Sequence, residues 1–305
     1  MMKQKKLFLI NSKANEGDAM KRWRVIAKKY KTLSENPVDM TTIADLSGFI
    51  KNDNPDLVVI IGGDGAINRV CQAVSPLSKK PLLAIIPLGF GNALSKCFGV
   101  ETVEKAVSVL EKQPGKVLID LFKTTIPEKP IGVFSMGVGF DAQIVHTRMY
   151  HRYIGMRSYI LAAIQSSIMH TMHKLTITID HKITLSSTAT ALIIANSPTI
   201  GRNFILSEDA KLDDGFLDCT LFSSHYAYFT NLRLRGFKHP LYSDENKVHF
   251  RAKHITISGE QFAQVDGDPA IHIKPIEIEI LPKAVTFLRN DIEKIELEQM
   301  PFTYE

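Results

Sequence analysis

Runs of apolar residues alternate with helical patterns along the first part of the chain. Three runs are continuous and apolar, at residues 5–10, 56–63 and 81–89, and VDMTT at 38–42 is a further strand candidate. Helical patterns separate or follow them at about 18–30, 44–51, 66–74, 92–100 and 103–112. Apolar strands that alternate with helices predict a parallel sheet that is covered on both faces.

The pattern changes near residue 116, where apolar and polar residues begin to alternate. Strands are predicted at 116–125, 131–140, 174–185, 188–197, 215–224, 253–260, 263–268 and 276–282. Alternating strands with turn residues between them are typical of antiparallel sheets, so this part is predicted to be a β-sandwich. One helix is expected at about 154–172, and we interpret its apolar face, with Met169 and Met172, as core packing in preference to a lipid entrance.

The two patterns divide the chain into two domains. We expect an α/β domain at residues 1–120, which the chain rejoins at about 288–305, and a mainly antiparallel β-sandwich domain at 121–287. A length of 305 residues agrees with two domains of ordinary size. The content of 45% hydrophobic and 23% charged residues is that of a soluble globular protein.

Charge and cysteine content indicate the kind of partner and the cellular compartment. The formal net charge of +5 favours acidic partners such as nucleotides or an anionic lipid surface, and it is too small to indicate nucleic acid. The cysteines Cys71, Cys97 and Cys219 form no CxxC pair, which predicts reduced thiols in the cytoplasm. No segment approaches the roughly eighteen apolar residues of a membrane-spanning helix. We therefore expect a cytoplasmic protein with peripheral membrane contact, and we leave open whether it forms a homodimer.

Two glycine-rich loops follow predicted strands. GGDG at 62–65 ends the third strand, and PLGFGN at 87–92 ends the fourth. Both loops lead into helices, whose free N–H groups and positive dipole ends suit a phosphate at the edge of the sheet. A carboxylate at Asp64 suits this place if Mg²⁺ lies between it and a nucleotide. A plain turn is the alternative for GGDG alone, because glycine turns after strands are common.

Six motifs resemble those of the diacylglycerol kinase catalytic family, which includes bacterial lipid kinases and sphingosine kinases. They are IIGGDGAIN at 60–68, IPLGFGNALSK at 86–96, SMGVGFDAQIV at 135–145, LIIANSPTIG at 192–201, AKLDDGFLD at 210–218 and QVDGDP at 264–269. NAD kinases share GGDG, but the combination and order of all six motifs resemble lipid kinases. NAD kinase is therefore the weaker alternative. The resemblance covers nearly the whole chain and implies an NAD kinase/diacylglycerol kinase-like fold.

The resemblance also implies a site for ATP and Mg²⁺ between the two domains. The residues expected near the nucleotide are Asn11, Thr41, Gly62, Gly63, Asp64, Gly65, Ala66, Asn68, Gly89, Gly91 and Asn92. Asp64 and Asp120 are expected around magnesium, and a separate structural magnesium site is expected at the Asp214 side chain and the carbonyls of Lys211 and Phe216.

A pair of acids matches the family's catalytic DGE motif. These acids are Asp266 and Asp268, with Asp in place of Glu at the second position. A carboxylate on such a turn would accept the proton of a lipid hydroxyl as the hydroxyl attacks the γ-phosphorus. The same VDGD sequence is at least as typical of a two-residue hairpin turn.

Four residues depart from the family pattern at the expected ATP site. Ala66 replaces Thr, Arg69 replaces Glu, Phe90 replaces a second Thr and Ala93 replaces Asp. The sequence predicts an ATP-dependent lipid kinase, with diacylglycerol, a sphingoid base or a related lipid as substrate. The departures leave two alternatives open, namely another phosphoryl donor and a catalytically weak or inactive homologue that binds lipid or nucleotide.

Overall fold

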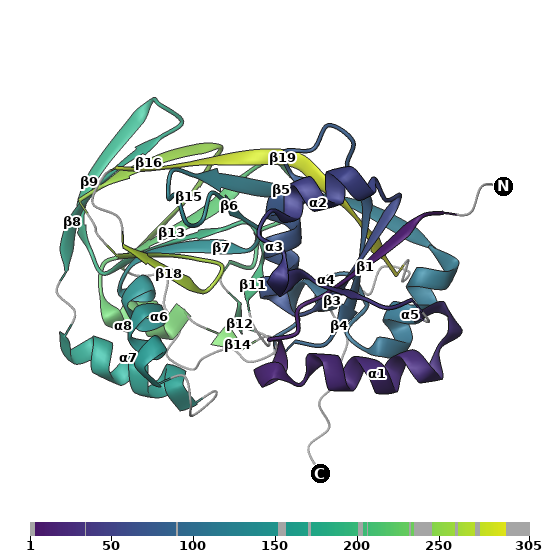
Figure 1. Ribbon diagram of the computed structural model, residues 1–305. Helices are drawn as coiled ribbons and strands as arrows, with labels where there is room; N and C mark the ends of the chain where they lie inside the picture. Colours follow the sequence, from purple (N-terminus) through teal and green to yellow (C-terminus); the bar gives the residue numbers. More distant parts are fainter. Residues whose placement is uncertain are drawn as a thin grey trace, which may run out of the picture.

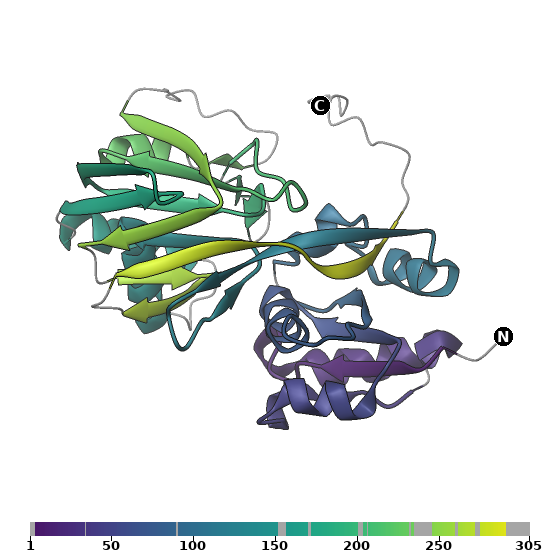
Figure 2. The same ribbon diagram turned by 90° about the horizontal axis from the view of Figure 1, so that it is seen from above.

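The computed structural model describes residues 4–33, 35–89, 91–151, 157–169, 172–200, 204–205, 207–231, 233–234, 246–259, 262–271 and 275–290. Two bodies lie next to each other, and two long strands, β5 (Gly115–Thr124) and β19 (Ile276–Arg289), extend through both (Figures 1 and 2). The predicted fold class is confirmed, because one body is built on parallel strands and the other contains an antiparallel sheet.

Parallel strands form the centre of the first body. Their order is β2 (Val38–Asp39), β1 (Lys6–Ile10), β3 (Leu57–Gly62) and β4 (Leu82–Pro87). The side chains of β3 are buried along its whole length, as expected for a strand between two layers of helices. The helices are α1 (Ala19–Lys29), α2 (Leu46–Asp53), α3 (Asp64–Val74), α4 (Ala93–Cys97) and α5 (Val103–Lys112).

The strand that was expected at 38–42 is shorter than predicted. It ends at Asp39, whose carboxylate accepts the N–H of Thr41 and starts the 3-10 helix Met40–Thr42. An aspartate that bonds to the backbone two residues ahead favours a turn over a continued strand. Two further 3-10 helices lie at Asn15–Gly17 and Lys31–Leu33.

One sheet continues from the first body into the second. β19 pairs with β4 in parallel at Phe287 and Leu83, and with β5 in antiparallel over most of its length. β16 (His254–Ser258) pairs with the other end of β19. The chain thus returns to the first body through β19. Residues 291–305, which include most of the expected return, lie outside the described residues, and the domain boundaries stay a prediction.

In the second body, an antiparallel sheet packs against the far end of the sheet that begins in the first body. Its strands are β15 (Lys247–Ala252), β13 (Leu217–Phe222), β10 (Ala191–Ala195), β7 (Ser135–Gly139), β17 (Phe262–Val265) and β18 (Asp268–Ile271), in that order. A shared core joins them to β16, β8 (His173–Ile179) and β9 (Ile183–Ala189). Short strands lie at β6 (Ile131–Gly132), β11 (Thr199–Ile200), β12 (Phe204–Ile205) and β14 (Arg233–Leu234).

Three helices lie on the second body: α6 (Phe140–His151), α7 (Arg157–Met169) and α8 (His225–Asn231). The sequence predicts only α7. Core packing was the wrong interpretation for Met169 and Met172, which are exposed. The face that α7 buries is made of small residues, so its large apolar side chains point to solvent. Among the helices that the structure describes, none is long and apolar enough to cross a bilayer.

Candidate active site

The two glycine loops touch each other. β3 and β4 are parallel neighbours with Gly62 opposite Pro87, so both loops leave the same edge of the sheet. Their backbones then come so close that a Cβ on Gly89 would lie 2.2 Å from the Cα of Gly63. No side chain fits in that space, which explains why both positions are glycine. Phosphate binding by these loops stays a prediction.

The first loop also packs against its own helix. A Cβ on Gly62 would lie 2.7 Å from the Cβ of Ala66 and 3.5 Å from the Cβ of Asn11. Ala66 is buried, whereas a Cβ on Gly65 would meet no other atom within 4 Å. Asn11 therefore lies beside the loop, and Gly65 is the open position of the loop.

Asn92 shapes the second loop. Its Oδ1 accepts the N–H of Gly89 at 3.1 Å, and its Nδ2 donates to the carbonyl of Gly89 at 3.0 Å. Asn92 has a φ of 52°, a left-handed conformation that asparagine tolerates better than most residues. Gly91 precedes it and is half-buried, and Phe90 lies outside the described residues. The Asn92 amide thus holds Gly89 against the first loop.

Asp64 begins α3 and reaches across to the second loop. Its Oδ1 accepts the N–H of Ala93 at 2.8 Å. Burial raises the pKa of the Asp64 carboxyl to about 6, and the charge of Asp266 adds to the rise. The N–H groups of Ala93 and Leu94 and the charge of Lys96 oppose it. The N–H of Ala93 thus binds Asp64 at the position where the family pattern has an aspartate. Lys96 is a nearby cation that the sequence motifs did not indicate.

A polar cluster lies where the chain leaves β1 and β2. The Oδ1 of Asp39 accepts the N–H of Thr41 at 3.0 Å and its hydroxyl at 2.9 Å. The hydroxyls of Ser12 and Thr41 are 3.2 Å apart. Asn11 accepts the N–H of Lys13 and so fixes the adjoining turn. The sequence predicts Asn11 and Thr41, but it misses Ser12 and Asp39, which hold Thr41 in place.

Arg69 supports the same region from α3. Its Nη2 donates to the carbonyl of Ile43 at 2.8 Å. Ile43 directly follows the 3-10 helix that contains Thr41. The arginine that replaces the usual glutamate is thus engaged by the backbone of the Thr41 loop.

Asp266 joins the second body to α3. It lies in a two-residue turn between β17 and β18, with φ of 53° for Asp266 and 82° for Gly267, as a type I′ hairpin requires. The Nδ2 of Asn68 donates to its carboxylate at 2.6 Å. The VDGD sequence is therefore a hairpin turn, and this turn also brings its first acid to the glycine-loop helix.

The carboxylate of Asp266 is saturated with donors. Besides Asn68, the N–H groups of Val133, Phe134 and Ser135 donate to it at 2.8, 2.7 and 3.0 Å. Four donors fill the four lone-pair positions of a carboxylate. Burial raises the pKa of the Asp266 carboxyl, and these hydrogen bonds oppose the rise.

Asp268 has a different environment from Asp266. Its side chain is 59% exposed and forms an ion pair with Lys129. Lys129 lies in the connection between β5 and β6. The two acids of the motif are therefore not equivalent, because one is enclosed by backbone donors and the other is open.

A chain of buried polar groups supports the turn. The Oε1 of Gln264 accepts the N–H of Gly267, and its Nε2 donates to Asp141 at 2.8 Å. The hydroxyl of Tyr228 donates to the other oxygen of Asp141 at 2.7 Å. Burial raises the pKa of the Asp141 carboxyl, and the two hydrogen bonds oppose this. The sequence reasoning missed these supporting residues, although Asp141 and Gln264 lie inside the quoted motifs.

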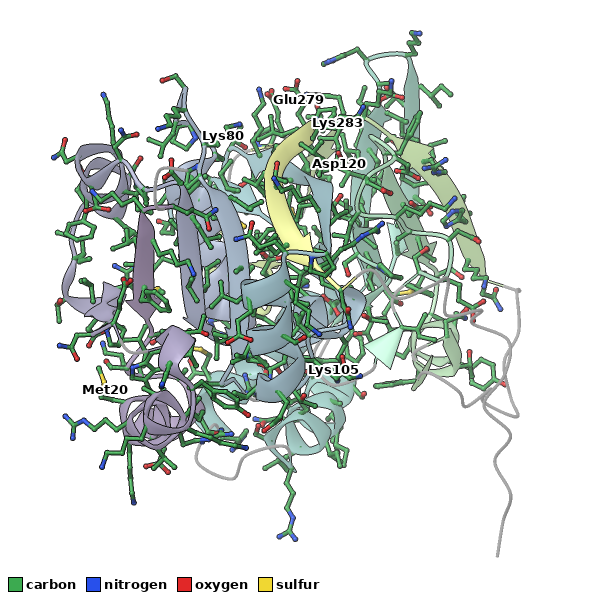
Figure 3. All side chains as sticks on the ribbon, turned by 90° about the vertical axis from the view of Figure 1, so that its right-hand side faces the viewer. Met20, Lys80, Lys105, Asp120, Glu279 and Lys283 are labelled. Carbon is green, nitrogen blue, oxygen red and sulfur yellow. The ribbon has the colours of Figure 1, made fainter. Side chains whose placement is uncertain are left out.

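Asp120 holds three segments of the chain together. Its Oδ1 accepts the N–H of Lys283 at 2.7 Å and its Oδ2 accepts the N–H of Gly215 at 2.6 Å. Figure 3 shows Asp120 and Lys283 next to each other on β5 and β19. The backbone of Asp120 also bonds to Leu212 and Asn196. The contacts of Asp120 therefore tie it to the KLDDGF loop and not to Asp64.

The KLDDGF loop contains an ion pair at its expected magnesium ligand. Asp214 accepts the N–H of Phe216 at 3.1 Å and forms an ion pair with Arg251. The Nε of Arg251 lies 3.5 Å from the buried carboxylate of Asp218, and its guanidinium lies 4.4 Å from the centre of the Phe216 ring. Lys211 is exposed at the start of the loop. One guanidinium thus lies between two carboxylates here.

The two expected magnesium sites differ in how well they fit the ion. Asp64 offers a hard carboxylate oxygen next to the like charge of Asp266, which suits a magnesium ion that is also held by phosphates. Asp214 does not fit in this arrangement, because Arg251 already occupies the place of the cation. Among the residues that the structure describes, no group of three or more His, Cys, Asp or Glu side chains is arranged to hold a metal.

Comparison with known proteins agrees with this architecture. The "Diacylglycerol kinase catalytic domain" model matches residues 5–123, and the "YegS C-terminal NAD kinase beta sandwich-like domain" model matches residues 133–289. A "Putative lipid kinase" from Staphylococcus haemolyticus is 29% identical over an alignment of 271 residues that covers 84% of each chain. A "Probable lipid kinase YegS-like" from Shewanella frigidimarina is 25% identical over 258 residues, 80% of this chain and 81% of the relative.

A solved structure shows the same fold. A crystal structure described as a "putative diacylglycerol kinase" from Bacillus anthracis has a TM-score of 0.74, covers 95% of this chain and 99% of its own, and is 22% identical. The fold is thus of the diacylglycerol kinase/NAD kinase type. The chain belongs to the diacylglycerol kinase catalytic domain family and carries its YegS-type C-terminal domain, as the motifs predict. Its relatives are named as lipid kinases.

Proposed function

We propose that this protein transfers the γ-phosphate of ATP to a hydroxyl group of diacylglycerol, a sphingoid base or a related lipid. The observation that carries the proposal is the hydrogen bond between Asn68 and Asp266. It joins the helix that follows the first glycine loop to the hairpin turn of the other body. A phosphate at the loops and a hydroxyl at the turn would therefore meet at one place.

The nucleotide side of the reaction depends on the packed loops. The backbone around Gly63 and Gly89, with the N-terminus of α3, would bind the phosphates, and the Thr41 cluster would lie beside them. Bound Mg²⁺ would neutralise charge on the phosphates, and Asp64 is the residue that would hold it. Asp120 and Asn92 act through other residues, since their side chains position the backbone.

The acceptor side of the reaction needs a base with a free lone pair. The hydroxyl oxygen of the lipid would form a bond to the γ-phosphorus while the bond from that phosphorus to the bridging oxygen of ADP breaks. The hydroxyl proton would pass to Asp268, because Asp266 already accepts four hydrogen bonds. Asp266 would then be a positioning residue that keeps the turn next to Asn68.

A catalytically weak lipid- or nucleotide-binding homologue is the second candidate. Ala66 is buried without a polar group, and Arg69 is bonded to the carbonyl of Ile43, so neither side chain supplies the group that the family pattern has there. Such a protein would keep the fold and the packed loops while transferring phosphate slowly or not at all.

One experiment separates the two candidates. Purified protein is incubated with labelled ATP, Mg²⁺ and a panel of extracted lipids, and its thermal unfolding is measured with each ligand. Labelled lipid together with magnesium-dependent protection by ATP would support the kinase. Protection by lipid alone, without transfer from ATP or GTP by a folded protein, would support the binding homologue.

A further inference from the structure

Helix α7 exposes the kind of residue that an ordinary surface helix buries. The residues that it buries are small, namely Ser158, Ala162 and Ser166. Its large apolar side chains are exposed, with Ile160 at 65%, Ile164 at 57% and Ile168 at 81%. These three follow each other at intervals of four residues and form one stripe. A soluble monomer gains nothing from such a stripe, so it indicates a surface that meets an apolar partner.

The surroundings of the stripe are apolar, aromatic and basic. Met149 and Tyr150 at the end of α6 are exposed, as is Tyr226 on α8. From Ala142 to Ile179 the sequence contains no Asp or Glu, while Arg148 and Arg157 lie in this segment. Tyrosine rings beside apolar and basic residues are typical of proteins that lie in the headgroup region of a bilayer.

A second helix adds positive charge on the same side of the molecule. α1 and α7 both lie along the lower side in Figure 1. The exposed residues of α1 include Lys21, Arg22, Arg24 and Lys28, with Val25 exposed between them. The helix contains no Asp or Glu. One side of the molecule thus presents an apolar stripe under one body and a cationic helix under the other.

We infer that this side docks the protein on an anionic lipid bilayer, with the stripe of α7 in the headgroup region and α1 against lipid phosphates. The inference rests on the proposed function for its purpose, because a kinase for lipid hydroxyls must reach its acceptor at a membrane. Binding to vesicles is nonetheless measured without any turnover, so the two proposals fail separately.

Charge favours the bilayer over a second copy of the chain as the occupant. A symmetric dimer places the same surface on both sides of the interface. In such a dimer, Arg157 and the cations of α1 would face the same surface of the second copy, where residues 142–179 contain no Asp or Glu. Like charges in contact oppose association, whereas anionic headgroups attract them by about 1 kcal/mol for each basic residue.

The test is flotation of the full chain with vesicles in the absence of nucleotide. One set of vesicles is phosphatidylcholine alone, and the other contains equal parts of phosphatidylcholine and phosphatidylglycerol. We expect binding to the anionic set only. Ile164→Ser with Ile168→Ser should weaken it at least about tenfold. Arg24→Glu with Lys28→Glu should weaken it by a similar factor and remove its salt dependence.

Matched variants on other faces are the controls. Ile183→Ser changes a residue that is also 57% exposed but lies on β9. Lys51→Glu with Lys79→Glu reverses two exposed charges beside α2. Both should bind like the unchanged protein. Equal loss in test and control variants, no binding to anionic vesicles, or a dimer in sedimentation that only the Ile164→Ser and Ile168→Ser variant abolishes would each overturn the inference. Vesicle binding by a protein without kinase activity would uphold it and refute the proposed function instead.

Discussion

The Nδ2 of Asn68 lies 2.6 Å from the carboxylate of Asp266, which follows it by 198 positions in the sequence. Asn68 is one helical turn beyond Asp64 on α3, so the same helix carries an acid of the glycine loop and the partner of the hairpin acid. This contact brings the nucleotide loops and the predicted acceptor site together, and it suggests direct tests.

Loss of the Asn68 amide should leave a buried carboxylate with one donor fewer. Asn68→Ala is expected to lower the free energy of unfolding by about 1.5–3 kcal/mol, because hydrogen bonds to charged groups are worth that much. It should also lower phosphate transfer more than ATP binding, since the turn moves and the loops do not. Urea unfolding and kinetics measure both effects. Asn52→Ala, an exposed change on α2, is the control, and equal stability of the two variants would refute the structural role of the contact.

The contact between the glycine loops predicts an unequal response to alanine. Gly89→Ala should lower the free energy of unfolding by about 1–3 kcal/mol and abolish nucleotide binding, because its Cβ would overlap the Cα of Gly63. Gly65→Ala adds the same methyl group where no other atom lies within 4 Å, so its thermal unfolding should be nearly unchanged. Similar losses in both variants would contradict the observed packing.

The pKa of Asp64 predicts a pH dependence of stability. Because its folded pKa is raised from 3.8 to about 6, the folded state holds a proton that the unfolded state releases. The stabilisation from this proton is complete below the unfolded pKa and is lost as the pH rises through about 6.

Asp64→Asn cannot lose this proton. We expect its stability relative to the unchanged protein to rise by about 3 kcal/mol between roughly pH 3 and pH 7. Chemical unfolding in the presence of a chelator and without nucleotide measures the difference, with the exposed Asp209→Asn as the control. A difference between Asp64→Asn and the unchanged protein that is constant over this range would contradict the buried environment of Asp64.

Arg251 should make the KLDDGF loop independent of magnesium. Arg251→Gln leaves Asp214 and the buried Asp218 without their shared cation, so we expect a clear loss of thermal stability that Mg²⁺ partly restores. Lys123→Gln removes an exposed ion pair with Glu279 and should change little. Strong stabilisation by Mg²⁺ alone of an Asp64→Asn variant, which lacks the other expected magnesium ligand, would show that the ion displaces Arg251.

Local patterns predicted the parallel sheet well, and contacts distant in the sequence limited the rest. The continuous apolar run of β3 and the glycines after it identify both strand and loop. By contrast, the sequence places a strand end at Pro282, whereas β19 continues through a bulge with Lys283 at a φ of 50°. The Lys283 N–H in this bulge donates to Asp120, a contact that no local pattern contains.

Missed helices and site residues have similar physical causes. α6 begins directly after β7 and contains few residues with strong helix preference, and its first residue, Phe140, falls inside the strand predicted at 131–140. Ser12, Asp39 and Gln264 act by holding other residues in place. The contacts of Ser12 with Thr41 and of Gln264 with Asp141 depend on the fold, whereas the bond from Asp39 to Thr41 is local. Asp64, Asp266 and Asp268 could be named from motifs.

The most direct test of the central claim is the rate of phosphate transfer from ATP to the best lipid acceptor, measured for the unchanged protein and for Asp268→Asn. The account predicts magnesium-dependent transfer that falls by about 100-fold or more in the variant, with ATP binding and thermal stability retained. The exposed Asp213→Asn should transfer phosphate at the unchanged rate. Transfer that Asp268→Asn leaves intact would remove the proposed base, and a folded protein that transfers no phosphate to any lipid would contradict the proposed kinase function itself.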